Sequence, residues 1–209
     1  MFSLKALSPN LIQKSCFLTF SALLLGACAQ KFNDLPNTRV LKTCQEPIAS
    51  YHLMGLKSGD YNDLTIPNTQ VQQMVAKSLA QSGCFIQSEQ ISTETTNTQK
   101  NHYQLEVVFG NINTQTKQGG FWSSQTSDQA VFEVQLNFHR TNEVRIFRGK
   151  SSIQNQNSQY LVIFGEKSKL NPNQIQITIQ NAINSAINEA TRNLIQEVQN
   201  KDSTNYSNF

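Results

Sequence analysis

Hydrophobic and polar residues change their spacing along the chain, and this spacing predicts where strands lie. Apolar residues alternate with polar ones at 103–109 and again at 132–138, which is the pattern of half-buried strands. A short polar turn at 141–143 follows the second run, so the next strand should pair with it as a hairpin. Shorter apolar runs predict further strands at 48–54, 84–86 and 144–147, with an optional one at 160–164.

Two other segments repeat their apolar residues every three to four positions, which is the period of an amphipathic helix. The first is predicted at 68–82, with Asn68 as its N-cap and Gly83 just past its end, where a left-handed backbone suits glycine. The second is predicted to begin after Asn171 with Pro172 in its first turn. The inward faces are Val71, Met74, Val75 and Leu79 in the first helix, and Ile175, Ile179, Ile183, Ile187 and Leu194 with Ala182, Ala186 and Ala190 in the second.

The order of these elements, β-α-β-β-β-β-(β)-α, predicts an α+β fold. We expect an antiparallel sheet of about five to six strands packed against two helices. A single domain should span 44–200, and the polar residues 201–209 should form a disordered tail. The polar stretch 92–101 and the turn-rich stretch 110–128 should be loops.

Composition narrows the class of protein. Only 15% of the 209 residues are charged, below the usual ~25%, and 24 Gln and 22 Asn supply much of the polarity instead. Nine glycines and a single long apolar run exclude collagen-like and polytopic membrane proteins. The 17 basic and 14 acidic residues form no dense basic patch, so nucleic acid is not an expected partner.

The first residues have the features of an export signal that ends in a lipid attachment site. Lys5 and Lys14 precede an apolar run too short to span a membrane, and small residues follow it. Residues 25–28, Leu-Gly-Ala-Cys, resemble the bacterial lipobox, in which cleavage leaves an acylated N-terminal cysteine. This resemblance implies a signal peptide at 1–27, lipid on Cys28, and a tether at 28–43. Ala29 in place of Asp implies the periplasmic face of the outer membrane. An ordinary secretory signal with a chance cysteine is the alternative.

Two cysteines remain in the exported domain, Cys44 and Cys84. An even pair in an oxidising compartment predicts a disulfide, which would close a loop of about 40 residues. Both positions lie at the ends of predicted elements, which favours their meeting when the first helix packs on the sheet. The alternatives are two buried free thiols or a cysteine-based catalytic site.

The segments around these cysteines resemble a known family. Cys44-Gln45-Glu46-Pro47 precedes the first strand, and Ser82-Gly83-Cys84-Phe85 joins the first helix to the second strand. This pairing resembles the lipoproteins related to the curli-assembly channel (CsgG-like), over roughly residues 44–198. The chain departs from that family at Ser88-Glu89-Gln90, where an Arg-Gly pair is common. The channel also requires long membrane hairpins; residues 131–138 could supply one leg, whereas the polar 150–160 could not face lipid.

Candidate chemistry is sparse. His52, His102 and His139 form no metal-binding motif, and neither a cofactor-binding loop nor a nucleophile elbow is present, so we expect no metal, no cofactor and no catalysis. Phe121 and Trp122 follow Gly119 and Gly120 in a turn-rich segment, where they are candidates for partner contact. Their alternative role is to fold back over the sheet edge as a cover for the core.

These observations predict a lipid-anchored, non-enzymatic accessory or binding lipoprotein on the periplasmic face of the outer membrane. Its partners would be membrane lipid, through acylated Cys28, and an envelope protein in assembly or secretion. The alternative is a subunit of an oligomeric secretion channel of the curli-export type, which would require a homo-oligomer.

Overall fold

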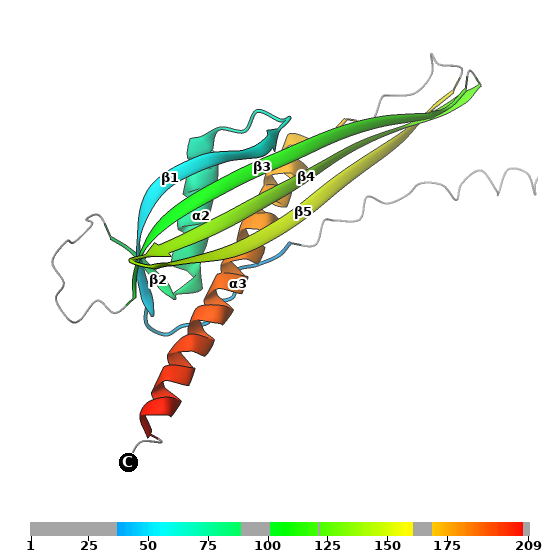
Figure 1. Cartoon of the computed structure of the whole chain (residues 1–209). Helices are drawn as coiled ribbons and strands as arrows, with labels where there is room; N and C mark the ends of the chain where they lie inside the picture. Colours follow the sequence, from blue (N-terminus) through cyan, green and yellow to red (C-terminus); the bar gives the residue numbers. More distant parts are fainter. Residues whose placement is uncertain (1–36, 89–100, 121, 161–168, 207–209) are drawn as a thin grey trace, which may run out of the picture. The chain divides into compact units, whose positions relative to one another are not determined.

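The fold is described on a computed structural model, for residues 37–88, 101–120, 122–160 and 169–206. The chain divides into two units, Met1–Asp34 and Leu35–Phe209, and every element described here belongs to the second. Those elements are β1 (Ala49–Asn62), α2 (Asn68–Ser82), β2 (Phe85–Gln87), β3 (His102–Gly119), β4 (Ser123–Arg140), β5 (Glu143–Tyr160) and α3 (Pro172–Tyr206), shown in Figure 1. The fold is α+β, with one five-stranded sheet and two helices.

The sheet is mixed, and the prediction of an antiparallel sheet was wrong. Its strand order is β2-β1-β3-β4-β5; β1 pairs in parallel with both β2 and β3, whereas β3, β4 and β5 pair antiparallel. The helical crossover through α2 returns the chain beside β1 in the same direction, as such crossovers do. Strand β3 then occupies the other side of β1. Periodicity reveals which residues are half-buried but carries no information about these directions.

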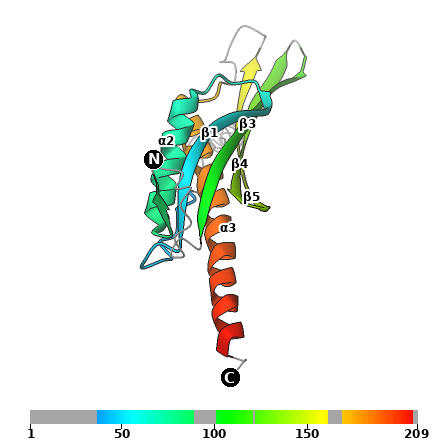
Figure 2. The same ribbon diagram turned by 60° about the vertical axis from the view of Figure 1, so that its left-hand side comes forward.

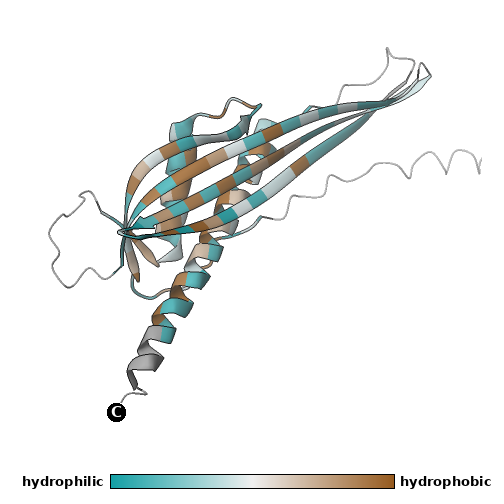
Figure 3. Ribbon diagram, in the orientation of Figure 1, coloured by the Kyte–Doolittle hydropathy of each residue, from teal (hydrophilic) through white to brown (hydrophobic). Residues whose placement is uncertain are grey.

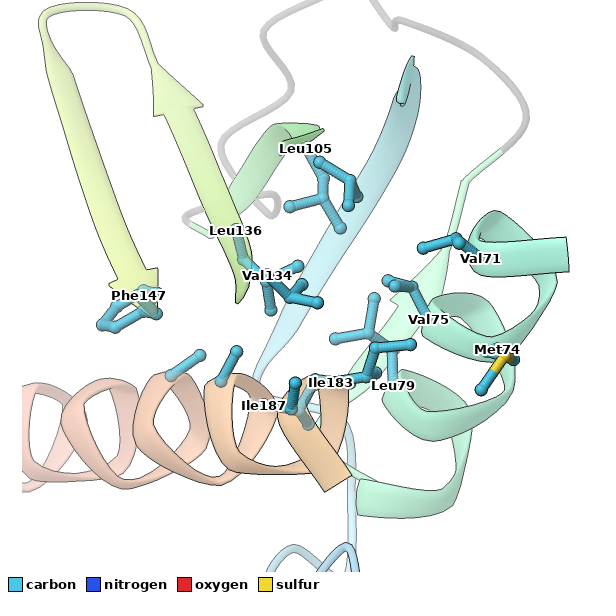
Figure 4. Packing of buried hydrophobic residues seen from close by; sticks show 14 of the residues in the cluster. Val71, Met74, Val75, Leu79, Leu105, Val134, Leu136, Phe147, Ile183 and Ile187 are labelled. Carbon is cyan, nitrogen blue, oxygen red and sulfur yellow. The ribbon is translucent and has the colours of Figure 1, made fainter. Parts of the chain in front are cut away.

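Both helices pack on one face of the sheet and leave the other face open, as Figures 1 and 2 show. Strands β3 and β4 contribute alternate buried residues such as Leu105, Val107, Val134 and Leu136, all 0% exposed. Each such side chain contributes about 1.5–3 kcal/mol when fully buried. Figure 4 shows side chains from β3, β4, β5 and both helices directed into one core. The labelled residues are Val71, Met74, Val75, Leu79, Leu105, Val134, Leu136, Phe147, Ile183 and Ile187.

Helix α2 has the predicted bounds but not the predicted N-cap. Pro67 occupies the N-cap position without a side-chain hydrogen bond, and Asn68 is the first helical residue. The end is as predicted: Gly83 has φ 71°, and its N–H donates to the Ala80 carbonyl. A Cβ at this glycine would lie 2.8 Å from the Cys44 carbonyl oxygen, so the backbone crossing there requires glycine.

Cys44 and Cys84 form a disulfide in the structure, with their Cα atoms 5.0 Å apart. The sulfurs join the segment that leads into β1 to the segment that leaves α2. Both residues belong to the buried core, Cys44 at 8% and Cys84 at 0% exposure. The bridge therefore lies inside the packed end of the β1–α2–β2 unit.

Helix α3 begins as the sequence predicts. The Asn171 side-chain oxygen accepts a hydrogen bond from the Asn173 N–H at 2.9 Å, which is the geometry of an N-cap. Its Ile and Ala face is buried from Ile179 to Leu194, and Ile175 is half-buried against the same core. The helix continues to Tyr206, past Lys201, where the sequence predicted the start of a disordered tail.

A glycine allows α3 to approach β5 closely. A Cβ on Gly149 would collide with the Ala182 carbonyl oxygen and would lie 2.6 Å from the Ala186 nitrogen. On the same face of β5, the guanidinium of Arg145 contacts both Glu143 and Glu197. Hydrogen bonds to Glu197 and then to Glu143 raise the pKa of Arg145, whose guanidinium joins β5 to α3.

The strands are longer than the sequence predicted. β1 continues to Asn62 through an irregularity at Leu53–Gly55, where Gly55 has φ 145°. Residues 110–119 and 123–128, predicted as loop, belong to β3 and β4. The optional strand at 160–164 and the loop at 92–101 lie almost wholly outside the described residues.

Candidate partner-binding site

The outer parts of β3, β4 and β5 form a polar three-stranded extension, here called the arm: residues 113–119, 123–129 and 154–160. Pairing is continuous to the tip, where Gly119 pairs with Ser124 and Ser123 with Tyr160. In Figure 1 this part of the sheet extends away from the helices, and in Figure 3 its strands are teal to white. The arm sequences are Asn-Thr-Gln-Thr-Lys-Gln-Gly, Ser-Ser-Gln-Thr-Ser-Asp-Gln and Gln-Asn-Gln-Asn-Ser-Gln-Tyr.

Side-chain hydrogen bonds across the strands hold the arm together in place of an apolar core. Gln125 donates to Gln156 at 3.2 Å, and Gln154 donates to the Ser127 hydroxyl at 2.9 Å. Cross-strand pairs of this kind contribute about 0.2–1 kcal/mol each. The absence of apolar alternation explains why the sequence predicted loop here. A run of Gln, Asn, Thr and Ser on neighbouring segments of similar length was the signal that would have suggested a polar ribbon.

The arm ends in a tight turn that displays an aromatic side chain. Gly119 has φ 108°, and a Cβ there would lie 2.5 Å from the Ser123 carbonyl oxygen. The same carbonyl accepts the Gly120 N–H at 3.0 Å, closing the turn. Trp122 is 76% exposed, whereas its predicted companion Phe121 lies outside the described residues. Trp122 therefore does not fold back to cover the core, which was its alternative predicted role.

The open face of the sheet carries a hydrogen-bonded chain across four strands, which the sequence did not reveal. Lys57 pairs with Glu106 at 2.5 Å, and Asn137 donates to Glu106 at 3.1 Å. Gln135 donates to Asn137 at 2.8 Å, and Arg148 donates to Gln135 at 2.8 Å. The hydrogen bond from Lys57, followed by that from Asn137, lowers the pKa of Glu106. The polar residues that alternate with the apolar ones at 103–109 and 132–138 were the sequence signal that could have indicated this hydrogen-bonded chain.

The same face is hollowed where β1 crosses the base of the arm. The hollow measures about 420 Å³ and is lined by Ser58, Gly59, Asp60, Tyr61, Val108, Gly110, Asn111, Ile112, Val131, Glu133, Gln135 and Lys150. Two glycines shape it, since a Cβ on Gly59 would lie 3.2 Å from the Gly110 Cα. Tyr61, 61% exposed, lies beside it, and Glu133 and Lys150 face each other as strand partners. The hollow lies between the arm and the rest of the domain, here called the body, in which the sheet packs against α2 and α3.

The three histidines also lie on the open face, closer together than their spacing in the sequence indicates. His52 and His139 are both strand partners of Gln104, and His102 is the partner of Ser50. His52 and His102 hydrogen-bond the Ser88 carbonyl and the Ser50 hydroxyl, and His139 Nε2 lies 3.9 Å from Glu106. Among the residues the structure describes, no group of three or more His, Cys, Asp or Glu side chains could hold a metal ion.

Cys28, the predicted site of lipid attachment, lies outside the described residues. Within 37–88, 101–120, 122–160 and 169–206, neither helix is long and apolar enough to cross a membrane.

Comparison with known proteins gives no family assignment. No protein-family model and no curated protein matches the chain. Among solved structures, a protein designated a neuraminyllactose-binding hemagglutinin homolog from Helicobacter pylori is 13% identical, with a TM-score of 0.39 over 84% of this chain and 96% of that one. The hypothetical protein CT253 from Chlamydia trachomatis is 11% identical, with a TM-score of 0.28 over 73% of this chain and 96% of that one. TM-scores this low support no argument, and the resemblance to curli-related lipoproteins stays a prediction.

Proposed function

We propose that the chain is a lipid-anchored, non-enzymatic accessory lipoprotein of the outer membrane, which binds an envelope protein through its arm. The lipobox at 25–28 and Ala29 support the anchor and the location. The Cys44–Cys84 disulfide fits an oxidising compartment. Proteins that expose a polar ribbon with an aromatic tip offer a partner both hydrogen-bonding groups and an apolar contact.

The observation that carries the proposal is the arm itself. Ordering each residue of a strand costs about 1–2 kcal/mol of conformational entropy. In the body this cost is offset by burial, but the arm carries almost no apolar side chains. Its strands therefore contribute little to the stability of the domain, which favours a role in contact. Trp122 at the tip is the residue type that most often anchors an interface.

Site-specific photo-crosslinking in cells tests this role. A photoreactive phenylalanine analogue at Trp122 should give a discrete crosslinked product with an envelope protein. The same analogue at Leu41, which is 62% exposed but outside the arm, is the matched control and should give none. Equal crosslinking at both positions, or none at Trp122, would overturn the proposal. An SDS-resistant oligomer crosslinked through Trp122 would instead favour the channel alternative.

A further inference from the structure

Three asparagines on α3 bind the backbone of the segment that precedes β1. Thr38 N–H donates to the Asn181 side-chain oxygen at 2.8 Å, and the Thr38 carbonyl accepts from Asn184 at 2.5 Å. The third asparagine, Asn188, makes two hydrogen bonds. Its side-chain oxygen accepts the Leu41 N–H at 3.1 Å, and its side-chain nitrogen donates to the Arg39 carbonyl at 3.0 Å. We call residues 38–43 the strap and the three asparagines the ladder.

The spacing of the ladder fits an extended chain. Positions 181, 184 and 188 lie on one face of a helix, because residues three and four apart are neighbours. Seven helical residues rise about 10.5 Å, and three extended residues from Thr38 to Leu41 span about 10 Å. The strap can therefore run beside α3 with its backbone groups opposite successive amides. Among the strap side chains, Leu41 is 62% exposed, whereas Val40 packs against the core, so the backbone bonds to the ladder and one apolar side chain hold the strap together.

The ladder is held in place from α2. Ser78, which is 0% exposed, donates to the Asn184 oxygen at 2.9 Å. Gln180 donates both to Ser78 and to Asn184, each at 2.7 Å. The middle amide of the ladder thus has its oxygen occupied by the interhelical contact, so its nitrogen is directed toward the strap.

The far end of the strap is fixed covalently. Thr43 N–H donates to the Ser82 carbonyl at 3.2 Å, and the next residue is Cys44 of the disulfide. The strap, the last part of the tether predicted over 28–43, is therefore bound along its length.

We infer that the ladder is a built binding site for the chain's own tether, and that it sets how far the domain can move from the membrane. The inference rests on the proposed lipid anchor at Cys28. With the strap bound, the chain from Cys28 to Thr38 has ten Cα-to-Cα steps, a reach of at most about 36 Å. With the strap released, the chain from Cys28 to Cys44 has sixteen such steps, a reach of at most about 58 Å. Binding of the strap therefore shortens the maximum distance between the domain and the bilayer by about 22 Å.

Amide exchange tests the ladder. In the full-length mature lipoprotein, NMR should show slow exchange of the Thr38 and Leu41 amides. Asn188→Ala should speed exchange at Leu41 about tenfold, the effect of one lost hydrogen bond of ordinary strength. Asn188→Asp keeps the acceptor for Leu41 N–H and should restore much of the protection. Asn193→Ala is the matched control, because Asn193 donates within α3, to the Glu189 carbonyl. Fast exchange at both amides in the unaltered protein would overturn the ladder.

Reflectometry on a supported bilayer tests the reach. The domain layer should lie closer to the bilayer in the unaltered protein than in Asn188→Ala combined with Thr38→Pro, which removes the Thr38 N–H. The difference should not exceed about 22 Å. If the Leu41 amide exchanges fast in the variant but the domain layer lies at the same height above the bilayer in both proteins, the inference that the strap limits the reach is wrong. A protein that lacks acyl chains on Cys28 and does not bind the bilayer would refute the proposed anchor, while amide exchange would still decide whether the ladder binds the strap.

Discussion

The body and the arm share strands β3, β4 and β5 but are stabilised differently. In the body, alternate residues of β3 and β4 are fully buried against α2 and α3. In the arm, the same strands continue in unbroken register with Gln, Asn, Ser and Thr on both faces. Strand register that is fixed in the packed core therefore continues into the arm, which has no apolar core of its own. The comparison separates the residues that stabilise this protein from those available for contact.

The largest expected effect comes from opening the disulfide in the body. Cys44→Ser with Cys84→Ser should lower the free energy of unfolding by about 4 kcal/mol, a loop-entropy estimate for a separation of 40 residues. Urea unfolding monitored by circular dichroism measures the change. The fold should survive, because α3 and the β3–β5 hairpins bury their own part of the core. An unchanged midpoint would show that the bridge contributes nothing to the body.

A second test compares a glycine of the body with a glycine of the arm. Gly149→Ala should cost about 3 kcal/mol or more, because the added methyl group meets the backbone of α3. Gly120→Ala is the matched change at the arm tip, where nothing lies within 4 Å of the added Cβ. It should alter stability by less than about 0.5 kcal/mol. Thermal unfolding of the two variants checks both values, and similar losses would contradict the division into body and arm.

Truncations on β4 and β3 sharpen the comparison. Leu136→Ala removes a fully buried side chain and should cost about 2–5 kcal/mol. Thr114→Ala, at an exposed arm position, should cost less than about 0.5 kcal/mol. Denaturant titration of each variant gives the two numbers. A loss of several kcal/mol at Thr114 would mean that the arm contributes to global stability.

Much of the body could be predicted from the sequence, because burial leaves a periodic signature. Alternation located the inner parts of β3 and β4, and the 3.6-residue spacing with Gly83 located α2. The Asn171-Pro172 pair marked the start of α3. The parallel pairing of β1 and β2 follows from the helical crossover between them. The parallel pairing of β3 with the other edge of β1 leaves no periodic signature in the sequence.

The candidate site was predicted less well than the fold. The aromatic residue near two glycines indicates Trp122 as a candidate contact, but the sequence predicts loop for the strands that carry it. Strand pairing there depends on neighbouring polar segments rather than on apolar alternation. The Asn ladder was hidden for a similar reason: positions 181, 184 and 188 look like a solvated helix face until the strap is placed beside them.

The smallest expected effect concerns pH and the open face. The pKa of Glu106 is lowered in the folded state, so its contribution is fully present above the unfolded value of about 4.3. That contribution is lost as the pH falls through the lowered folded-state pKa. Glu106→Gln should therefore reduce stability at pH 7 by about 1 kcal/mol or less and flatten the acid side of the stability profile. An unaltered acid profile would contradict the role of the Lys57–Glu106–Asn137 contacts.

The most direct test of the central claim replaces the arm tip and measures stability and partner capture together. Residues 118–125 are exchanged for Asn-Gly, which joins the strand partners Lys117 and Thr126 by a two-residue hairpin turn. The account predicts a free energy of unfolding within about 0.5 kcal/mol of the unaltered protein and loss of the envelope protein that crosslinks through Trp122. Retention of that protein by the shortened chain, detected with a crosslinker that does not depend on position 122, would contradict the account.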